Sequence, residues 1–143
     1  MPERFPEQGP QWITLQSLLQ GIPLPGGDRP ASLGDLPLAR EKGGAVRVLR
    51  EGLEPETVEQ ILQEPDLKVI LIDPEDVSAV LPAAGSALLR SRVVFPDPGQ
   101  AQVWLEICGV TQAELQVWET FLVTMRRGPK GWTVEGEPLQ LAT

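Results

Sequence analysis

The pattern between residues 45 and 95 constrains the fold of this chain more than any other feature. Three apolar runs are separated by two segments with helix-like spacing. "AVRVLRE" alternates apolar and polar residues, as a half-buried strand does, whereas "LKVILID" is almost continuously apolar, as expected for a strand covered on both faces. We expect strands over 45–51, 67–73 and 92–95, and helices over 55–64 and 77–91. This order predicts right-handed crossovers and an α/β fold with a small, mainly parallel three-stranded core.

The segments after residue 99 favour a C-terminal helical pair. Residues 100–109 and 111–127 are expected to form two helices separated at a Gly-Val pair. The apolar residues of the second segment recur with the 3-4-3 spacing of a helix face: Leu115, Trp118, Leu122 and Met125. The end of the chain, "GWTVEG" followed by "PLQLA", predicts a short β-hairpin or two edge strands.

Residues 1–44 form a segment of different composition, which we expect to be a Pro/Gly-rich arm. It holds seven Pro and seven Gly, so regular structure is expected only in one short helix over 11–21, with Gly21 as its stop. The leucines of the arm could pack over its own domain or dock on a partner. The chain is therefore divided into this arm and a single α/β domain over 45–143.

The charge and composition narrow the classes of partner. The net charge is −8 and acids exceed bases in both halves of the chain, so nucleic-acid binding is unlikely. No segment is long and apolar enough to span a bilayer, so we expect an acidic, soluble, cytoplasmic protein without a membrane partner. The lack of Asn, with few Cys and Met, is what a hot habitat or GC-rich coding would favour.

Missing residue types exclude several kinds of catalytic site. The chain has no His and one Cys, which removes the usual nucleophile-activating pairs and the common zinc sites. It has no phosphate-binding P-loop, and no cofactor is expected. These exclusions make an enzyme less favoured than a non-catalytic regulatory or adaptor protein that acts by binding another protein. Trp often anchors interfaces, and the residues proposed for such contacts are Trp12, Leu15, Leu18 and Trp132.

A second hypothesis rests on the segment "WLEICGVTQAELQVWETFL", which resembles a helix-turn-helix. With "RRGPKGWTVEGEPLQLA" as a β wing, the resemblance implies a winged-helix transcription regulator formed by residues 100–141. The basic side chains at the start of that wing, Arg126, Arg127 and Lys130, would then contact nucleic acid. Two packed helices followed by a hairpin is the purely structural interpretation, and it is the favoured one.

A third hypothesis concerns the acids that follow the apolar run "KVILI". The segment "EPDLKVILIDPED" resembles the third strand of response-regulator receiver domains, which implies a pseudo-receiver-like phospho-switch with Asp73 at the acceptor position. Alternatively, Asp73, Glu75 and Asp76 could hold Mg²⁺ through carboxylate oxygens. The plainer interpretation, which we favour, is a turn fixed by Pro74 and a helix start at which acids are stabilised.

Overall fold

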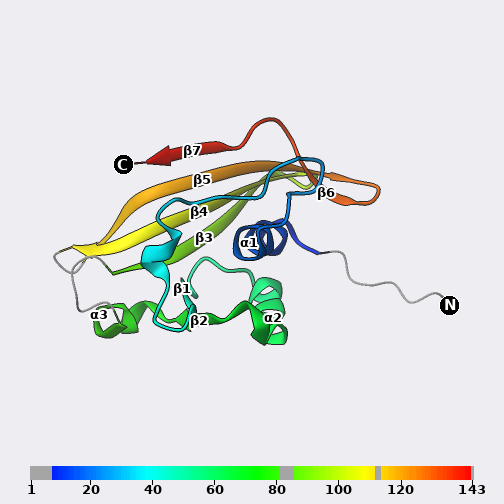
Figure 1. Ribbon diagram of the computed structural model, residues 1–143. Coiled ribbons are helices and arrows are strands. Elements are labelled where there is room, and N and C mark those ends of the chain that lie inside the picture. Colours follow the sequence, from blue (N-terminus) through cyan, green and yellow to red (C-terminus); the bar gives the residue numbers. More distant parts are fainter. Residues whose placement is uncertain (1–7, 81–85, 112–113, 143) are drawn as a thin grey trace.

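The fold is a seven-stranded mixed β-sheet that curves over one helix (Figure 1). The computed structural model describes residues 8–80, 86–111 and 114–142. Its strands are β1 (Val46–Leu49), β2 (Val69–Ile72), β3 (Ala87–Asp97), β4 (Gln100–Thr111), β5 (Glu114–Gly128), β6 (Gly131–Val134) and β7 (Leu139–Ala142). Its helices are α1 (Pro10–Gln20), α2 (Pro55–Gln63) and the short α3 (Val77–Val80), with 3-10 turns at Leu36–Ala39, Pro65–Leu67 and Pro74–Asp76.

The strands follow the order β2-β1-β3-β4-β5-β6, and β7 pairs with β5 beside β6. β1 pairs in parallel with both β2 and β3, whereas β3, β4 and β5 form a long antiparallel meander. The expected fold, a small three-stranded core with a C-terminal helical pair, is therefore wrong. The parallel strands occupy one end of a larger sheet, and β2 is its edge strand, although its side chains pack against apolar residues on both faces.

The C-terminal helical pair was predicted wrongly because both segments carry apolar residues on two faces. Residues 100–111 and 114–128 are the strands β4 and β5. In β4 the residues of the main core alternate with period two: Ala101, Val103, Leu105 and Ile107. The helical spacing in the second segment is coincidental, since Leu122 and Met125 lie on opposite faces of β5.

The helix expected over 77–91 is also wrong in its second half. α3 ends at Val80, residues 81–85 lie outside the described residues, and β3 begins at Ala87. Leu88 and Leu89 are buried, but they lie in a strand and point to opposite faces of the sheet. At the end of the chain, the expectation of short strands agrees with β6 and β7, although each pairs with β5.

One face of the sheet is covered by α1 and the segment that follows it. Gly21 ends α1 in the left-handed conformation, with φ of 71°, and its N–H donates to the Ser17 carbonyl. From the arm, Leu24, Leu33 and Leu36 join the same core as Val103 and Phe121 of the sheet. The arm therefore packs on its own sheet.

The opposite face carries a second, smaller core near α3. It consists of Leu49, Ile72, Val77, Leu88 and Cys108. These residues come from β1, β2, α3, β3 and β4, so the short helix α3 covers one end of the sheet, formed by β1, β2, the start of β3 and the end of β4. This arrangement positions Cys108 as a fully buried free thiol.

Glu119 joins the arm to the C-terminal strands. Its carboxylate accepts hydrogen bonds from the backbone N–H groups of Gly34 and Asp35 at 2.9 and 2.8 Å. It also accepts one from the Gln140 amide of β7 at 2.9 Å. Because Glu119 is buried, these three donors satisfy a carboxylate that would otherwise be costly to remove from water.

A β-bulge interrupts the pairing of β4 and β5 close to Glu119. Ile107 pairs with Glu119 and Cys108 with Val117, so Trp118 is the extra residue in β5. A Cβ at Gly109 would overlap the Trp118 indole. Glycine is therefore required at this position because the indole occupies the space of a side chain.

Candidate binding surfaces

The four residues proposed for partner contacts lie in the core of the protein. Trp12, Leu15, Leu18 and Trp132 have exposed fractions of 1, 0, 7 and 7%, respectively. Leu15 and Leu18 point from α1 into the main core, where Trp132 of β6 also packs. The structure thus uses these side chains for folding, and a partner would have to contact other residues.

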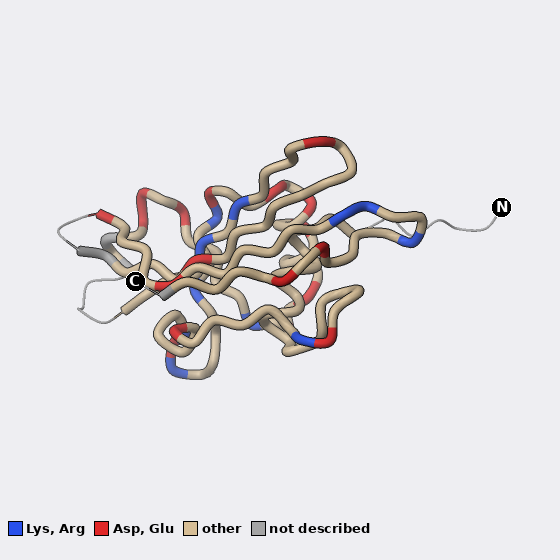
Figure 2. Tube along the Cα trace, turned by 90° about the horizontal axis from the view of Figure 1, so that it is seen from above, with Lys and Arg blue, Asp and Glu red and all other residues tan. Residues whose placement is uncertain are grey.

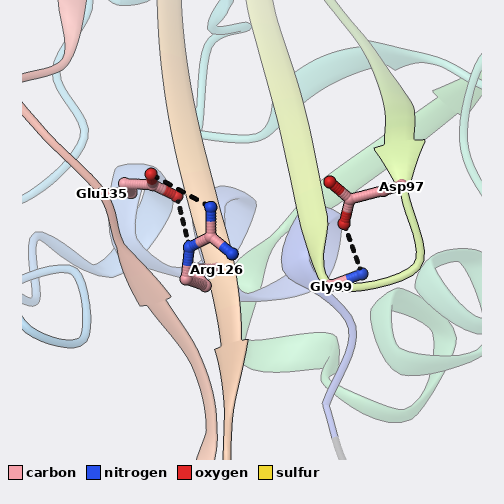
Figure 3. A network of polar contacts seen from close by, with 4 residues as sticks. All are labelled: Asp97, Gly99, Arg126 and Glu135. Atoms are coloured by element: carbon pink, nitrogen blue, oxygen red, sulfur yellow. Dashed lines mark hydrogen bonds and ion pairs between the residues drawn. The ribbon is translucent and has the colours of Figure 1, made fainter.

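The residues proposed for nucleic-acid binding lie on the hairpin that joins β5 and β6. Figure 3 shows Arg126 facing Glu135, with Nε to Oε2 at 2.9 Å and an Nη2 to Oε1 hydrogen bond at 3.2 Å. The hydrogen bond and the charge of Glu135 raise the pKa of Arg126. Arg127 and Lys130 are exposed on the same hairpin, while acidic positions are spread over the rest of the trace (Figure 2). Since residues 100–111 and 114–128 are strands, the helix-turn-helix behind the transcription-regulator hypothesis is not formed.

The turn on the adjacent hairpin, between β3 and β4, is held by the Asp97 side chain and by the backbone of β5. Gly99 N–H donates to Asp97 Oδ1 at 2.8 Å (Figure 3). Gly99 C=O accepts a hydrogen bond from the Arg127 N–H at 2.9 Å. The charge of Asp97 adds to the rise in the pKa of Arg126. These polar groups are therefore committed to the two hairpins.

The three acids after β2 are exposed and lie apart from other potential ligands. Asp73 precedes the 3-10 turn Pro74–Asp76, and its side chain makes no capping hydrogen bond. The Asp76 N–H donates to the Asp73 backbone carbonyl at 2.9 Å, so the turn is closed by the main chain. Within the described residues, no group of three His, Cys, Asp or Glu side chains is arranged to hold a metal ion. The structure thus brings Asp73, Glu75 and Asp76 to one exposed turn without a ligand cluster.

Several exposed or half-buried apolar side chains lie on the sheet face opposite α1. We call it the open face, and its residues are Arg92, Val94, Trp104, Leu122, Leu139 and Leu141. Strand register aligns Arg92 of β3, Trp104 of β4, Leu122 of β5 and Leu139 of β7 in one row across the sheet. Side chains in directly paired positions share a face of the sheet, so the four are neighbours.

Three residues of the open face are unusually exposed for apolar side chains. Leu139, Leu141 and Val94 have exposed fractions of 50, 49 and 46%, while Trp104 and Leu122 are half-buried between them. Figure 1 shows α1 beneath the arch of β3, β4 and β5, and β7 on the side away from α1. Among the described residues, α3 is the only helix on this side, and it packs at the far end.

The charged groups of the open face are arranged around its tryptophan. The Arg92 guanidinium carbon lies 4.8 Å from the centroid of the Trp104 ring, a cation–π geometry. In the neighbouring row, Arg90 forms an ion pair with the buried carboxylate of Glu106 at 3.0 Å. Within the described part of the chain Arg92 forms no ion pair.

A cleft of about 830 Å³ lies elsewhere, between the arm and the β6–β7 connection. Leu24 and Phe121 are among its apolar lining residues, and Asp28, Arg29 and Glu137 contribute charges of both signs. Asp28, Arg29 and Glu137 are exposed side chains. The cleft therefore lacks the convergent buried polar groups typical of small-molecule sites.

Sequence reasoning missed the open face because it treated Trp104 and Leu122 as parts of helices. The signal was present in β4, where Gln102, Trp104 and Glu106 alternate with the apolar residues of the main core. Read as a strand, this alternation places Trp104 on the face opposite the core.

No family model, curated protein or solved structure matches this chain. In the described residues, no helix is both long and apolar enough to cross a membrane. Function is therefore argued from the surfaces of the molecule alone.

Proposed function

We propose that this protein acts by binding another protein, without catalysing a reaction, and that it does so through the open face. The observation that carries the proposal is the row of Arg92, Trp104, Leu122 and Leu139 on the sheet face away from α1. Trp and Arg are the residues most enriched at the energetic centres of protein interfaces. Large contiguous exposed apolar patches mark protein–protein contact sites.

The chemistry of the open face favours a partner that presents an apolar surface next to a carboxylate. Leu139 and Leu141 offer aliphatic area from an edge strand, and burial of this area would be favourable. The Trp104 ring holds the Arg92 guanidinium in place. Arg92 can therefore bind a carboxylate with less loss of side-chain entropy than a free arginine.

Affinity capture from a lysate of the native host, quantified by mass spectrometry, tests this function. The variant combines Leu139→Ser with Leu141→Ser, which removes apolar surface from two exposed positions without opening the core. The matched control is Leu62→Ser, because Leu62 is 67% exposed and lies on α2, away from the open face. We expect a partner that the wild-type protein and the control retain and that the double variant loses.

A second variant tests whether Arg92 contributes to binding of the partner. Arg92→Ala should weaken retention of the same partner by about tenfold, since hot-spot truncations cost more than 1 kcal/mol. Retention of the same proteins at the same level by wild type, double variant and control would refute binding through the open face.

A further inference from the structure

The edge strand β2 leaves half of its backbone hydrogen-bonding groups without a partner in the described residues. The Val46 N–H donates to the Lys68 carbonyl, and the Arg50 N–H donates to the Ile72 carbonyl, each at 2.8 Å. A parallel ladder uses the backbone of every second residue. Val69 and Leu71 therefore direct their N–H and C=O groups away from β1, toward the outer side of the sheet.

No other described strand pairs with that outer side. β2 pairs with β1 only, and none of the hydrogen bonds among the described residues involves the backbone of Val69 or Leu71 outside the ladder with β1. Four backbone groups in register, two donors and two acceptors, form a template for one further strand.

The side chains of β2 would give such a strand apolar neighbours on both faces. Val69 and Leu71 pack against the main core, and Ile70 and Ile72 pack with the second core under α3. Natural edge strands are commonly protected by charged residues or Pro within the strand. β2 reads "VILI" and has neither.

The acidic residues that flank β2 favour an added strand that carries positive charges at its ends. Residues 64–76 carry five acids, all exposed, and one base, Lys68. The acids are Glu64, Asp66, Asp73, Glu75 and Asp76. A second copy of this chain would bring two such acidic borders together, whereas a segment with Lys or Arg at its ends would be attracted to them.

We propose that the outer edge of β2 binds an extended segment of another protein as an additional strand, and that this segment has an apolar or β-branched centre with basic residues at both ends. Backbone hydrogen bonds would provide affinity, as in other cases of strand addition, and the flanking charges would provide selectivity. The proposal shares with the proposed function only the premise that the protein binds proteins. β1 and β3 separate the β2 edge from the centre of the open face.

Three labelled peptides test the proposal by fluorescence anisotropy with the full chain. The first is Lys-Lys-Val-Thr-Val-Thr-Val-Lys-Lys, the second replaces each Lys by Glu, and the third is the first with N-methyl groups on the outer valines. We expect the basic peptide to bind about tenfold more tightly than the acidic one at low salt. N-methylation should weaken binding by about fivefold for each hydrogen bond that it removes.

Amide hydrogen exchange of the complex locates the peptide. The N–H groups of Val69 and Leu71 should become protected when the basic peptide is added, because they would donate to it. Protection elsewhere, or equal affinity for the N-methylated peptide, would overturn strand addition at β2. If neither the basic nor the acidic peptide binds, strand addition at β2 is refuted. The short length of β2 and the acids beside it would then serve only to keep the edge unpaired.

Variants with altered charge test the selectivity without touching the core. Neutralisation of the three acids after β2 should weaken binding of the basic peptide by about tenfold, with little effect on the fold. Neutralisation of three exposed acids elsewhere should change it less than about twofold. The test variant is Asp73→Asn, Glu75→Gln and Asp76→Asn, and the control is Asp28→Asn, Glu114→Gln and Glu137→Gln.

Two further outcomes separate this proposal from its alternatives. The open-face variant Leu139→Ser with Leu141→Ser should bind the basic peptide as the wild type does, so loss of lysate partners and loss of peptide binding are independent results. A dimer of this chain that forms without peptide and resists it would mean that a second copy occupies the edge, contrary to the proposal.

Discussion

Raising the pH should destabilise this protein between about pH 9 and pH 11, because the fold requires Cys108 to remain protonated. The thiol is fully buried in the second core, and burial raises its pKa from the ordinary 9.0 to about 11. The positive charge of Arg90 opposes this rise and the negative charge of Glu106 adds to it. The free energy of unfolding at alkaline pH therefore depends on how well the second core, including α3, shields the Cys108 thiol from water.

The sign of the effect follows from proton binding. Below pH 9 the thiol is protonated in both the folded and the unfolded chain, so it contributes its full stability. As the pH rises toward 11, the unfolded chain loses the proton first and is stabilised relative to the folded state. A shift of about two pKa units corresponds to a loss of about 1 kcal/mol at pH 10 and roughly 2 kcal/mol by pH 11.

The composition of the chain limits the number of other side chains that could change stability between pH 9 and pH 11. The chain has one Cys, no Tyr and only three Lys, so few other side chains titrate in this range. Urea unfolding followed by tryptophan fluorescence, with a reductant present, gives the free energy of unfolding at each pH. The control is Cys108→Ala, which creates a small cavity but removes the titrating group.

The difference in stability between wild type and Cys108→Ala should decrease with rising pH, by the amounts given above. A difference that stays constant from pH 8 to pH 11 would show that the Cys108 thiol is accessible to water. In that case α3 would not cover the end of β4, and the arrangement of the second core would be incorrect.

Two further substitutions test local packing by the same urea assay. Gly109→Ala should destabilise the fold by about 1–3 kcal/mol because the new methyl group overlaps the Trp118 indole, whereas Gly27→Ala, with only ordinary contacts, should cost much less. Unchanged stability in Gly109→Ala would argue against the bulge. Glu119→Gln should cost about 2 kcal/mol, since one acceptor oxygen of a buried carboxylate becomes a donor, while the exposed Glu114→Gln should change stability by less than about 0.5 kcal/mol. Equal effects of these two would contradict the role of Glu119.

The elements that sequence reasoning located correctly are those whose residues have one dominant period. α1 and α2 lie within a residue of the expected ranges 11–21 and 55–64, and the runs around β1 and β2 are strands. β4 and β5 failed because each carries apolar residues on both faces, so helical spacing could be found in a strand. β-branched residues were the better indicator, since β5 holds Val117, Thr120, Val123 and Thr124.

The choice of contact residues failed for a different reason. Trp12 and Trp132, the tryptophans proposed as contact residues, are both buried, whereas Trp104 is half-buried on the open face. Exposure of a tryptophan in a sheet depends on which strands flank it and which face the helices cover. Neither the order β2-β1-β3-β4-β5-β6 nor the position of α1 can be inferred from local patterns, so Trp104 could be identified only from the fold.

The two proposed surfaces should respond differently to salt, which gives a way to assign any partner to one of them. Contacts at the open face depend mainly on apolar area, with one arginine held against Trp104, so they should persist at high ionic strength. Binding at the β2 edge combines backbone hydrogen bonds with attraction to exposed acids, so about 0.5 M salt should weaken it by screening that attraction. A partner that is released by salt and retained by the Leu139→Ser, Leu141→Ser variant therefore occupies the edge. A partner that salt does not release and that the double variant loses occupies the open face. A partner that is released by salt and also lost by the double variant contacts both surfaces, from β2 to β7.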